Sequence, residues 1–97
     1  MRIIARKTLI EFYTAYPDSR KQLEAWYAEV KTAQWKSFAD IKLKYRSADA
    51  IAGNRVIFNI CGNKFRLIVK IHYTAAIVYI RFIGTHSMYD RIEASEV

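Results

Sequence analysis

Three side chains that can transfer or orient protons lie close together near the carboxyl end of the sequence. His86, Tyr89 and Asp90 all belong to the stretch FIGTHSMYD, residues 82–90. If a turn of helix begins around Thr85, spacings of three and four residues place the three side chains on neighbouring positions of one face. Imidazole has the unperturbed pKa closest to neutral pH, and nearby cations lower the pKa of a phenol. The stretch therefore predicts a general acid–base group; the alternative is a structural His beside a Tyr and an Asp that pair locally.

The strands expected before this group carry positive charge on alternate positions. After Asn54 the runs RVIFNI, KFRLIVKIHY and AAIVYIRFIG follow one another, separated by short turns, and show the two-residue period of β-strands. One face is apolar, and in the last run it is assigned Ala76, Val78, Ile80 and Phe82. The opposite face is expected to hold Arg55, Lys64, Arg66, Lys70, Tyr79 and Arg81, without any carboxylate. Like charges on neighbouring strands repel one another, so this pattern favours an anionic ligand over a merely solvated face.

The first half of the chain predicts helices that would cover the apolar face of this sheet. Apolar side chains recur at three- and four-residue steps over residues 9–16 and again over 23–30. Pro17 ends the first helix, and Asp18 is expected to cap the second, so the two helices form a hairpin. A short third helix is expected to open at Ser37 with the form of a capping box.

The remaining segments complete the expected architecture. Residues 2–4 predict a short strand, and RSADAIAGN, residues 46–54, is interpreted as a loop. The sequence thus predicts one α+β domain over residues 1–97, with an amino-terminal helix hairpin on one face of a mainly antiparallel four-stranded sheet and a short carboxyl-terminal helical turn.

Composition indicates the class of partner. Sixteen Lys and Arg against nine Asp and Glu give a formal net charge of +7, which points to an anionic partner, nucleic acid first and an acidic protein second. The single Cys61 cannot form an internal disulfide, and one Cys with two His does not suffice for a zinc site. No apolar run is long enough for a membrane span or a signal peptide. We therefore expect a cytoplasmic protein without metal, cofactor or membrane partner.

Two blocks of sequence resemble the HigB toxins, a branch of the RelE-like superfamily. The blocks are F-N-x-x-G-N-x-x-R-L, over residues 58–67, and T-H-x-x-Y-D, over residues 85–90, with hydrophobic strands between them. The resemblance extends more loosely to the helical half, including Trp35 and SADAIAGNRV.

The resemblance implies a toxin of a bacterial toxin–antitoxin system that cleaves mRNA on the translating ribosome. It implies metal-independent attack by the ribose 2′-hydroxyl on its own 3′-phosphate, and neutralisation by a cognate DNA-binding antitoxin. Such chemistry needs a base, an acid and cations for the charge on phosphorus. We assign proton transfer to His86 and Tyr89, leaving open which is the base, and transition-state charge to Arg66 assisted by Lys64. Asp90 is expected to orient His86 or Arg66.

The other basic residues suit RNA and the ribosome. The phosphate- and base-binding set on the sheet comprises Arg55, Lys70, Arg81 and Tyr79, and Lys42, Lys44 and Arg46 form a second basic group. We expect the second group to contact ribosomal RNA, in the 16S region, although a solvated helix face would have the same composition. The alternative function is a non-catalytic module that binds RNA or the ribosome and inhibits translation by occupancy.

Overall fold

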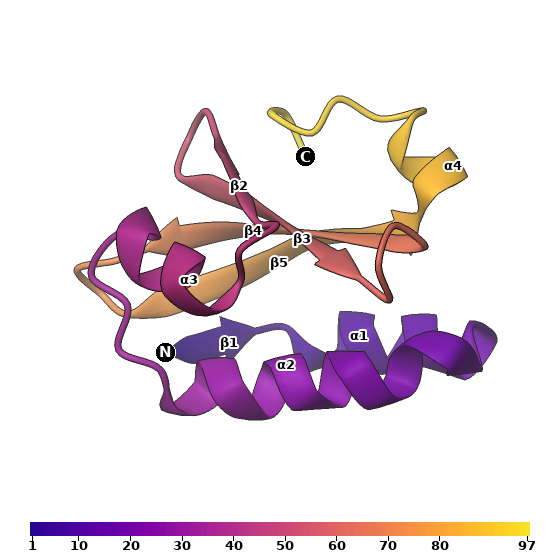
Figure 1. Cartoon of the computed structure of the whole chain (residues 1–97), viewed down its shortest axis with the longest axis horizontal. Coiled ribbons are helices and arrows are strands. Elements are labelled where there is room, and N and C mark those ends of the chain that lie inside the picture. The colour runs from indigo at the N-terminus through magenta and orange to yellow at the C-terminus, as the bar shows by residue number, and fades with distance from the viewer.

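A computed structural model describes all residues, 1–97, as one layered α+β domain (Figure 1). The elements in chain order are β1 (Arg2–Ile4), α1 (Arg6–Ala15), the 3₁₀ turn η1 (Pro17–Ser19), α2 (Arg20–Thr32), α3 (Phe38–Lys44), β2 (Asp49–Ile51), β3 (Arg55–Ile60), β4 (Phe65–His72), β5 (Ile77–Thr85) and α4 (His86–Tyr89). α1 and α2 lie together on one side of the sheet, and the segment that follows α4 returns over the other side. The expected α+β class is confirmed.

The sheet has five strands in the order β1-β5-β4-β3-β2 and is mixed, because β1 runs parallel to β5. The expected four-stranded sheet is therefore wrong in its strand count. The additional strand, β2, lies within residues 46–54, which were interpreted as a loop, and it pairs antiparallel with β3. Positive φ angles at Gly53 (76°) and Asn54 (57°) turn the chain back between the two strands. A strand of only three residues is too short to show an alternating pattern in the sequence.

The apolar stripes of α1 and α2 supply the helical side of the core. Leu9 and Phe12 of α1 are buried, as are Leu23, Trp26 and Val30 of α2. They form a single cluster with the inward-facing residues of β3, β4 and β5. The helices begin differently from expectation: Asp18 lies inside η1 rather than capping α2, and Ser37 makes no side-chain capping hydrogen bond at the start of α3.

A β-bulge in β5 inverts the expected face of one residue. Ile68 pairs with Phe82, but Val69 pairs with Ile80, so Arg81 has no partner in β4. The extra residue reverses the alternation that follows it. The assignment of Phe82 to the helical face is consequently wrong, and Ile83 packs against the core in its place.

On the face of the sheet away from α1 and α2, cross-strand partners form three rows. The rows are Arg55–Lys70–Tyr79, Ile57–Ile68–Phe82 and Asn59–Arg66–Gly84. The middle row is apolar and is itself covered, since Ile57 is 7% and Ile68 0% exposed. The segment after α4 lies on this side of the sheet (Figure 1), where the guanidinium Nε of Arg55 donates to the carbonyl of Val97 at 3.0 Å. The expected open cationic face is thus divided by an apolar band and partly covered.

Candidate active site

Helix α4 begins where the sequence predicts a helical turn. The Thr85 hydroxyl caps it by accepting a hydrogen bond from the Met88 backbone N–H at 3.2 Å. The backbone N–H of His86 donates to the carbonyl of Lys64 at 3.2 Å, immediately before β4. These bonds fix the start of α4 to the beginning of β4, where Phe65 pairs with Thr85. These contacts bring the THSMYD motif beside Arg66, which lies twenty positions before His86 in the chain.

Four of the predicted site residues meet at this junction, and we call them the β4–α4 cluster: Arg66, His86, Tyr89 and Asp90. His86 Nδ1 lies 3.1 Å from Asp90 Oδ2, and the two side chains remain 52% and 60% exposed. The Arg66 guanidinium carbon lies 5.7 Å from the centre of the Tyr89 ring, within the range of a cation–π contact. Arg66 Nη1 also donates to the carbonyl of Asn63 at 3.3 Å.

The Asp90 contact decides which imidazole nitrogen is available. A carboxylate at Nδ1 favours the tautomer with the proton on Nδ1, or the imidazolium, and leaves Nε2 for a ligand. The exposed imidazole can therefore accept or donate a proton at Nε2. Beside it, the Arg66 guanidinium offers further N–H donors to a phosphate. The cluster thus contains an oriented imidazole, a phenol and a cation.

Lys64 is adjacent to this cluster, but its ammonium is directed elsewhere. It hydrogen bonds and ion pairs with the carboxylate of Asp18 in η1, and its amine nitrogen lies 5.5 Å from the Phe65 ring centre. This hydrogen bond and the positive charge of Lys64 lower the pKa of the Asp18 carboxyl. Both side chains are more than half exposed, so the pair is free to exchange with other partners.

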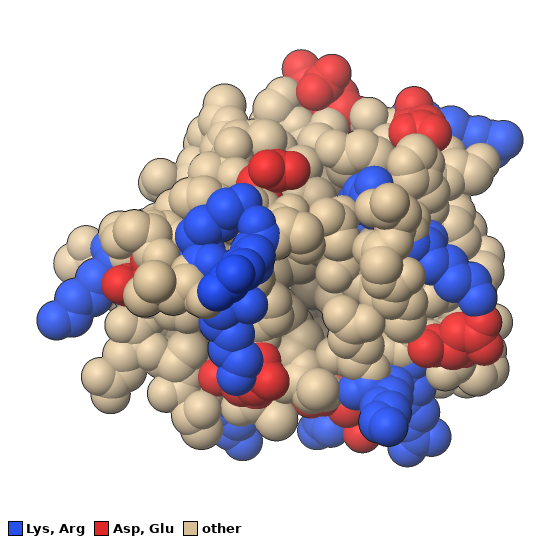
Figure 2. All heavy atoms as spheres, viewed as in Figure 1, with Lys and Arg blue, Asp and Glu red and all other residues tan.

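The expected RNA-binding residues fall into two separate groups. Arg55, Lys70 and Tyr79 form one row of the sheet, and the Arg81 guanidinium lies 5.8 Å from the Tyr79 ring centre. Lys42, Lys44 and Arg46 lie at the carboxyl end of α3 and just after it, outside the sheet. Figure 2 shows Lys and Arg side chains gathered over the α3 side of the molecule, next to a hollow in the surface.

In the second group, two of the three cations already have partners. Lys42 Nζ donates to the carbonyl of Ala48 at 2.8 Å, and Lys44 Nζ lies 3.2 Å from a carboxylate oxygen of Glu29. Arg46 is exposed. No hydrogen bond, ion pair or cation–π contact joins this group to the β4–α4 cluster.

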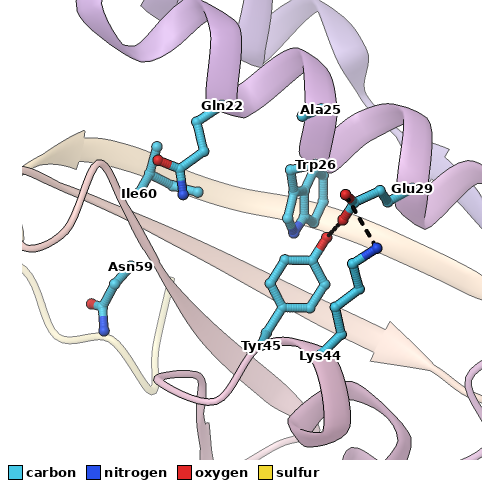
Figure 3. A pocket seen from close by; sticks show the side chains of 8 residues that line it. All are labelled: Gln22, Ala25, Trp26, Glu29, Lys44, Tyr45, Asn59 and Ile60. Carbon is cyan, nitrogen blue, oxygen red and sulfur yellow. Dashed lines mark hydrogen bonds and ion pairs between the residues drawn. The ribbon is translucent and has the colours of Figure 1, made fainter.

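Sequence reasoning missed a hollow of about 190 Å³ between α2, the end of α3 and β3 (Figure 3). Its lining residues are Gln22, Ala25, Trp26, Glu29, Lys44, Tyr45, Asn59 and Ile60. The Tyr45 hydroxyl donates to the Glu29 carboxylate at its wall. This hydrogen bond lowers the pKa of Glu29, whereas burial, followed by the hydrogen bond to Glu29, raises the pKa of Tyr45. No sequence signal identifies the site, because its residues come from segments without any shared motif.

Replacing Tyr45 with Phe is expected to lower the free energy of unfolding at pH 7 by about 1 kcal/mol, because it removes a hydrogen bond to a partly exposed carboxylate. The pKa of Glu29 is lower in the folded protein than its ordinary value of 4.5. The stabilisation by the Tyr45–Glu29 hydrogen bond is therefore complete above pH 4.5, and it is lost as the pH falls through the pKa that Glu29 has in the folded protein. Urea unfolding of both proteins from pH 3 to pH 7 measures this. A difference that stays constant down to pH 3 would contradict the role of the carboxylate.

Two structural findings concern metals and membranes. No three or more His, Cys, Asp or Glu side chains gather in an arrangement that would hold a metal ion. None of the helices has both the length and the apolar character needed to cross a membrane.

Comparison with known proteins identifies similar sequences over most of the chain. Residues 19–92 match the model of the HigB toxin family, described as the RelE-like toxic component of a toxin–antitoxin system. The chain is also similar to the mRNA interferase toxin HigB of Escherichia coli K12, with 26% identity over 92 residues that cover 93% of this chain and 88% of the relative. Proteins named mRNA interferase HigB from Escherichia coli O157:H7 and Shigella flexneri match with the same identity and coverage.

Proposed function

Because the chain belongs to the HigB family of RelE-like toxins, the toxic components of toxin–antitoxin systems, we propose that it is an endoribonuclease that cleaves mRNA at the β4–α4 cluster. The observation that carries the proposal is the Asp90-bound imidazole of His86 beside Arg66 and Tyr89. The names of the similar proteins, all mRNA interferases, point to the same substrate.

The proposed reaction is transfer of a phosphoryl group within the RNA strand. A base removes the proton of a ribose 2′-hydroxyl, and the 2′-oxygen forms a bond to the adjacent phosphorus. The bond from phosphorus to the 5′-oxygen of the next nucleotide breaks, and an acid protonates that oxygen. The products are a 2′,3′-cyclic phosphate and a free 5′-hydroxyl, so the step consumes no other reactant.

The cluster supplies a group for each requirement. His86 and Tyr89 carry the two proton transfers, and Asp90 holds the imidazole with Nε2 toward the substrate. Arg66 donates to the non-bridging oxygens, where negative charge accumulates in the transition state. Lys64 assists only after its ammonium leaves Asp18, which the exposure of that pair permits.

The charge distribution supports a large RNA partner. Seven excess positive charges attract a polyanion, and the basic residues at the end of α3 lie on a different part of the surface from the cluster. We propose that the chain binds the translating ribosome through 16S RNA in the cytoplasm, using this group and the Arg55–Lys70–Tyr79 row. A cognate DNA-binding antitoxin is the expected protein partner of the toxin.

The proposal is tested by the chemistry of the RNA ends. Purified protein is added to ribosomes stalled with a codon in the A site and, separately, to the same mRNA free in solution. We expect cuts in the ribosome-bound mRNA whose upstream fragments end in a 2′,3′-cyclic phosphate, detected because they are ligated by an RNA ligase specific for that end. Inhibition of translation with intact mRNA would instead support the alternative, a module that acts by occupancy.

A further inference from the structure

The hollow between α2, α3 and β3 lies beside the part of β3 that has no neighbouring strand on its outer side. β2 pairs with β3 only from Arg55 to Ile57, so the last residues of β3 form a free edge. The Ile71 N–H donates to the Asn54 carbonyl, so Asn54 is a residue whose backbone groups face β4. In an antiparallel pair every second residue faces the partner strand, and Asn59, five residues later, therefore turns its backbone N–H and C=O away from β4. No strand takes up the N–H and C=O of Asn59 at this edge.

A second polar group at the hollow also lacks a partner. Trp26 is 2% exposed, and its indole Nε1 has no hydrogen-bond acceptor. In Figure 3 this nitrogen is directed toward the Tyr45 hydroxyl, at the wall of the hollow. A buried donor without an acceptor destabilises the free protein. The nitrogen is itself enclosed, so it senses a ligand in the hollow through the adjacent Tyr45 and not by direct contact.

The amide side chain of Gln22 is oriented by a contact with the backbone. Gln22 Oε1 accepts from the Cys61 N–H at 2.6 Å, which leaves its NH₂ group as a donor. The Asn59 side chain points away from the other lining residues (Figure 3), and its Nδ2 donates to the Ser47 carbonyl at 3.2 Å, so Asn59 borders the hollow with its backbone. With the Gln22 NH₂ group and the free backbone groups of Asn59, the hollow presents both donors and acceptors. Its one carboxylate, Glu29, is already neutralised by Lys44 and Tyr45.

Asn59 connects the hollow to the β4–α4 cluster. It is the cross-strand partner of Arg66, and Arg66 is in turn the partner of Gly84, next to α4. The hollow therefore begins two strand spacings, about 10 Å, from the end of β5. An RNA strand whose phosphate lies on Arg66 reaches the hollow by passing around the free edge of β3.

From this arrangement we infer that the hollow is a subsite for one nucleobase of the substrate RNA, close to the cleaved phosphate. A volume of about 190 Å³ suits a single ring system rather than a larger ligand. Aromatic walls with mixed donors and acceptors are what unstacked RNA bases bind, by stacking and by hydrogen bonds on their edges. The inference rests on the proposed nuclease function and adds to it a source of sequence preference.

The test replaces Gln22 with Glu, which keeps the acceptor for the Cys61 N–H and removes the NH₂ donor. The matched control is Gln34→Glu, the same change at an exposed residue outside the hollow. Cut sites from a mixed mRNA pool on ribosomes are sequenced for all three proteins. We expect Gln22→Glu to keep cutting but to change the preference for one base near the cut by about tenfold, as expected for loss of one contact to a base edge. Gln34→Glu should match the wild type, and an unchanged preference in Gln22→Glu would overturn the inference.

A binding measurement separates failure of the subsite from failure of the nuclease. RNA oligonucleotides with 2′-O-methyl ribose at every position cannot react, because the attacking 2′-oxygen is blocked, and they are titrated into ¹⁵N-labelled protein. We expect the indole resonance of Trp26 to shift with the base composition of the oligonucleotide, with Trp35 as the internal reference. If the wild type cuts no RNA but this shift occurs, the nuclease proposal fails and the base subsite stands. If the Trp26 resonance stays unchanged with every oligonucleotide, the subsite is overturned whether or not RNA is cut.

Discussion

Replacing Arg66 with Ala is expected to reduce the rate of mRNA cleavage about 10²- to 10³-fold without unfolding the protein. Loss of one preorganised donor to the charge of a transition state typically has an effect of this size. The guanidinium carbon of Arg66 lies 5.7 Å from the centre of the Tyr89 ring, and Tyr89 shares α4 with His86, so Arg66 is placed at the groups that we propose transfer protons. Its side chain is only partly buried, and removing it leaves the core intact. Single-turnover cleavage on ribosomes measures the change.

Two further variants make this result specific to Arg66. Arg6→Ala is the matched control, because Arg6 also stacks on a tyrosine, with its guanidinium carbon 4.8 Å from the Tyr27 ring centre, but lies on α1. It should cleave at the wild-type rate. Arg66→Lys keeps the charge but loses the planar pair of donors, and we expect an intermediate rate. Equal rates for Arg66→Ala and the wild type would remove Arg66 from the proposed mechanism.

The helical half and the strand phase of β4 were predictable because they depend on local periodicity. Leu9, Leu23 and Val30 recur at helical spacing and are buried as expected. In β4 the alternation of Phe65, Leu67 and Val69 with polar positions is interrupted only by Ile68 and fixes which face each residue takes, and these three are buried in the core. Such patterns depend only on the period of the element and on which of its sides is buried.

Features that depend on non-local geometry were not predictable. The bulge at Arg81 reverses the face of Phe82, although the sequence from Val78 to Phe82 alternates without interruption. Strand β2 exists because it pairs with β3, and its own three residues carry no strand signal. The burial of Ile57 and Ile68 likewise could not be predicted without knowing that the last residues of the chain lie on this side of the sheet.

In the candidate site, too, contacts between residues close in sequence were predictable and contacts between distant residues were not. The His86–Asp90 contact is an i,i+4 pair, and such spacing can be found from sequence. The approach of Arg66 depends on the phase of β4, which was also predictable. In contrast, the engagement of Lys64 by Asp18 joins residues far apart in the chain, and the hollow at Asn59 arises only where the edge of β3 becomes free. These two features could be identified only after the fold was known, although the sequence had already suggested a role for Lys64.

Replacing Phe58 with Ala is expected to lower the free energy of unfolding by about 3–5 kcal/mol, the usual cost of removing a fully buried aromatic ring. Phe58 is 1% exposed, and its ring lies 5.5 Å from Trp26, 6.2 Å from Trp35 and 5.1 Å from Tyr45, between ring centres. It therefore joins α2, the segment before α3 and the end of α3 to the sheet. Its removal leaves a cavity that these rigid rings can close only in part.

Phe82→Ala is the matched control for this prediction and also a test of the bulge. Because the register at Arg81 turns Phe82 to the face away from the helices, its ring is only partly buried, and we expect a loss well below that for Phe58→Ala. Equilibrium unfolding in urea, followed by tryptophan fluorescence, gives both values, and Phe58→Ala should also broaden the Trp26 indole resonance. Similar losses for the two variants would mean that Phe82 packs in the same core as Phe58, as a strand without the bulge would require. The unfolding data therefore test the phase of β5, on which the position of Gly84 beside Arg66, and with it the geometry of the proposed site, depends.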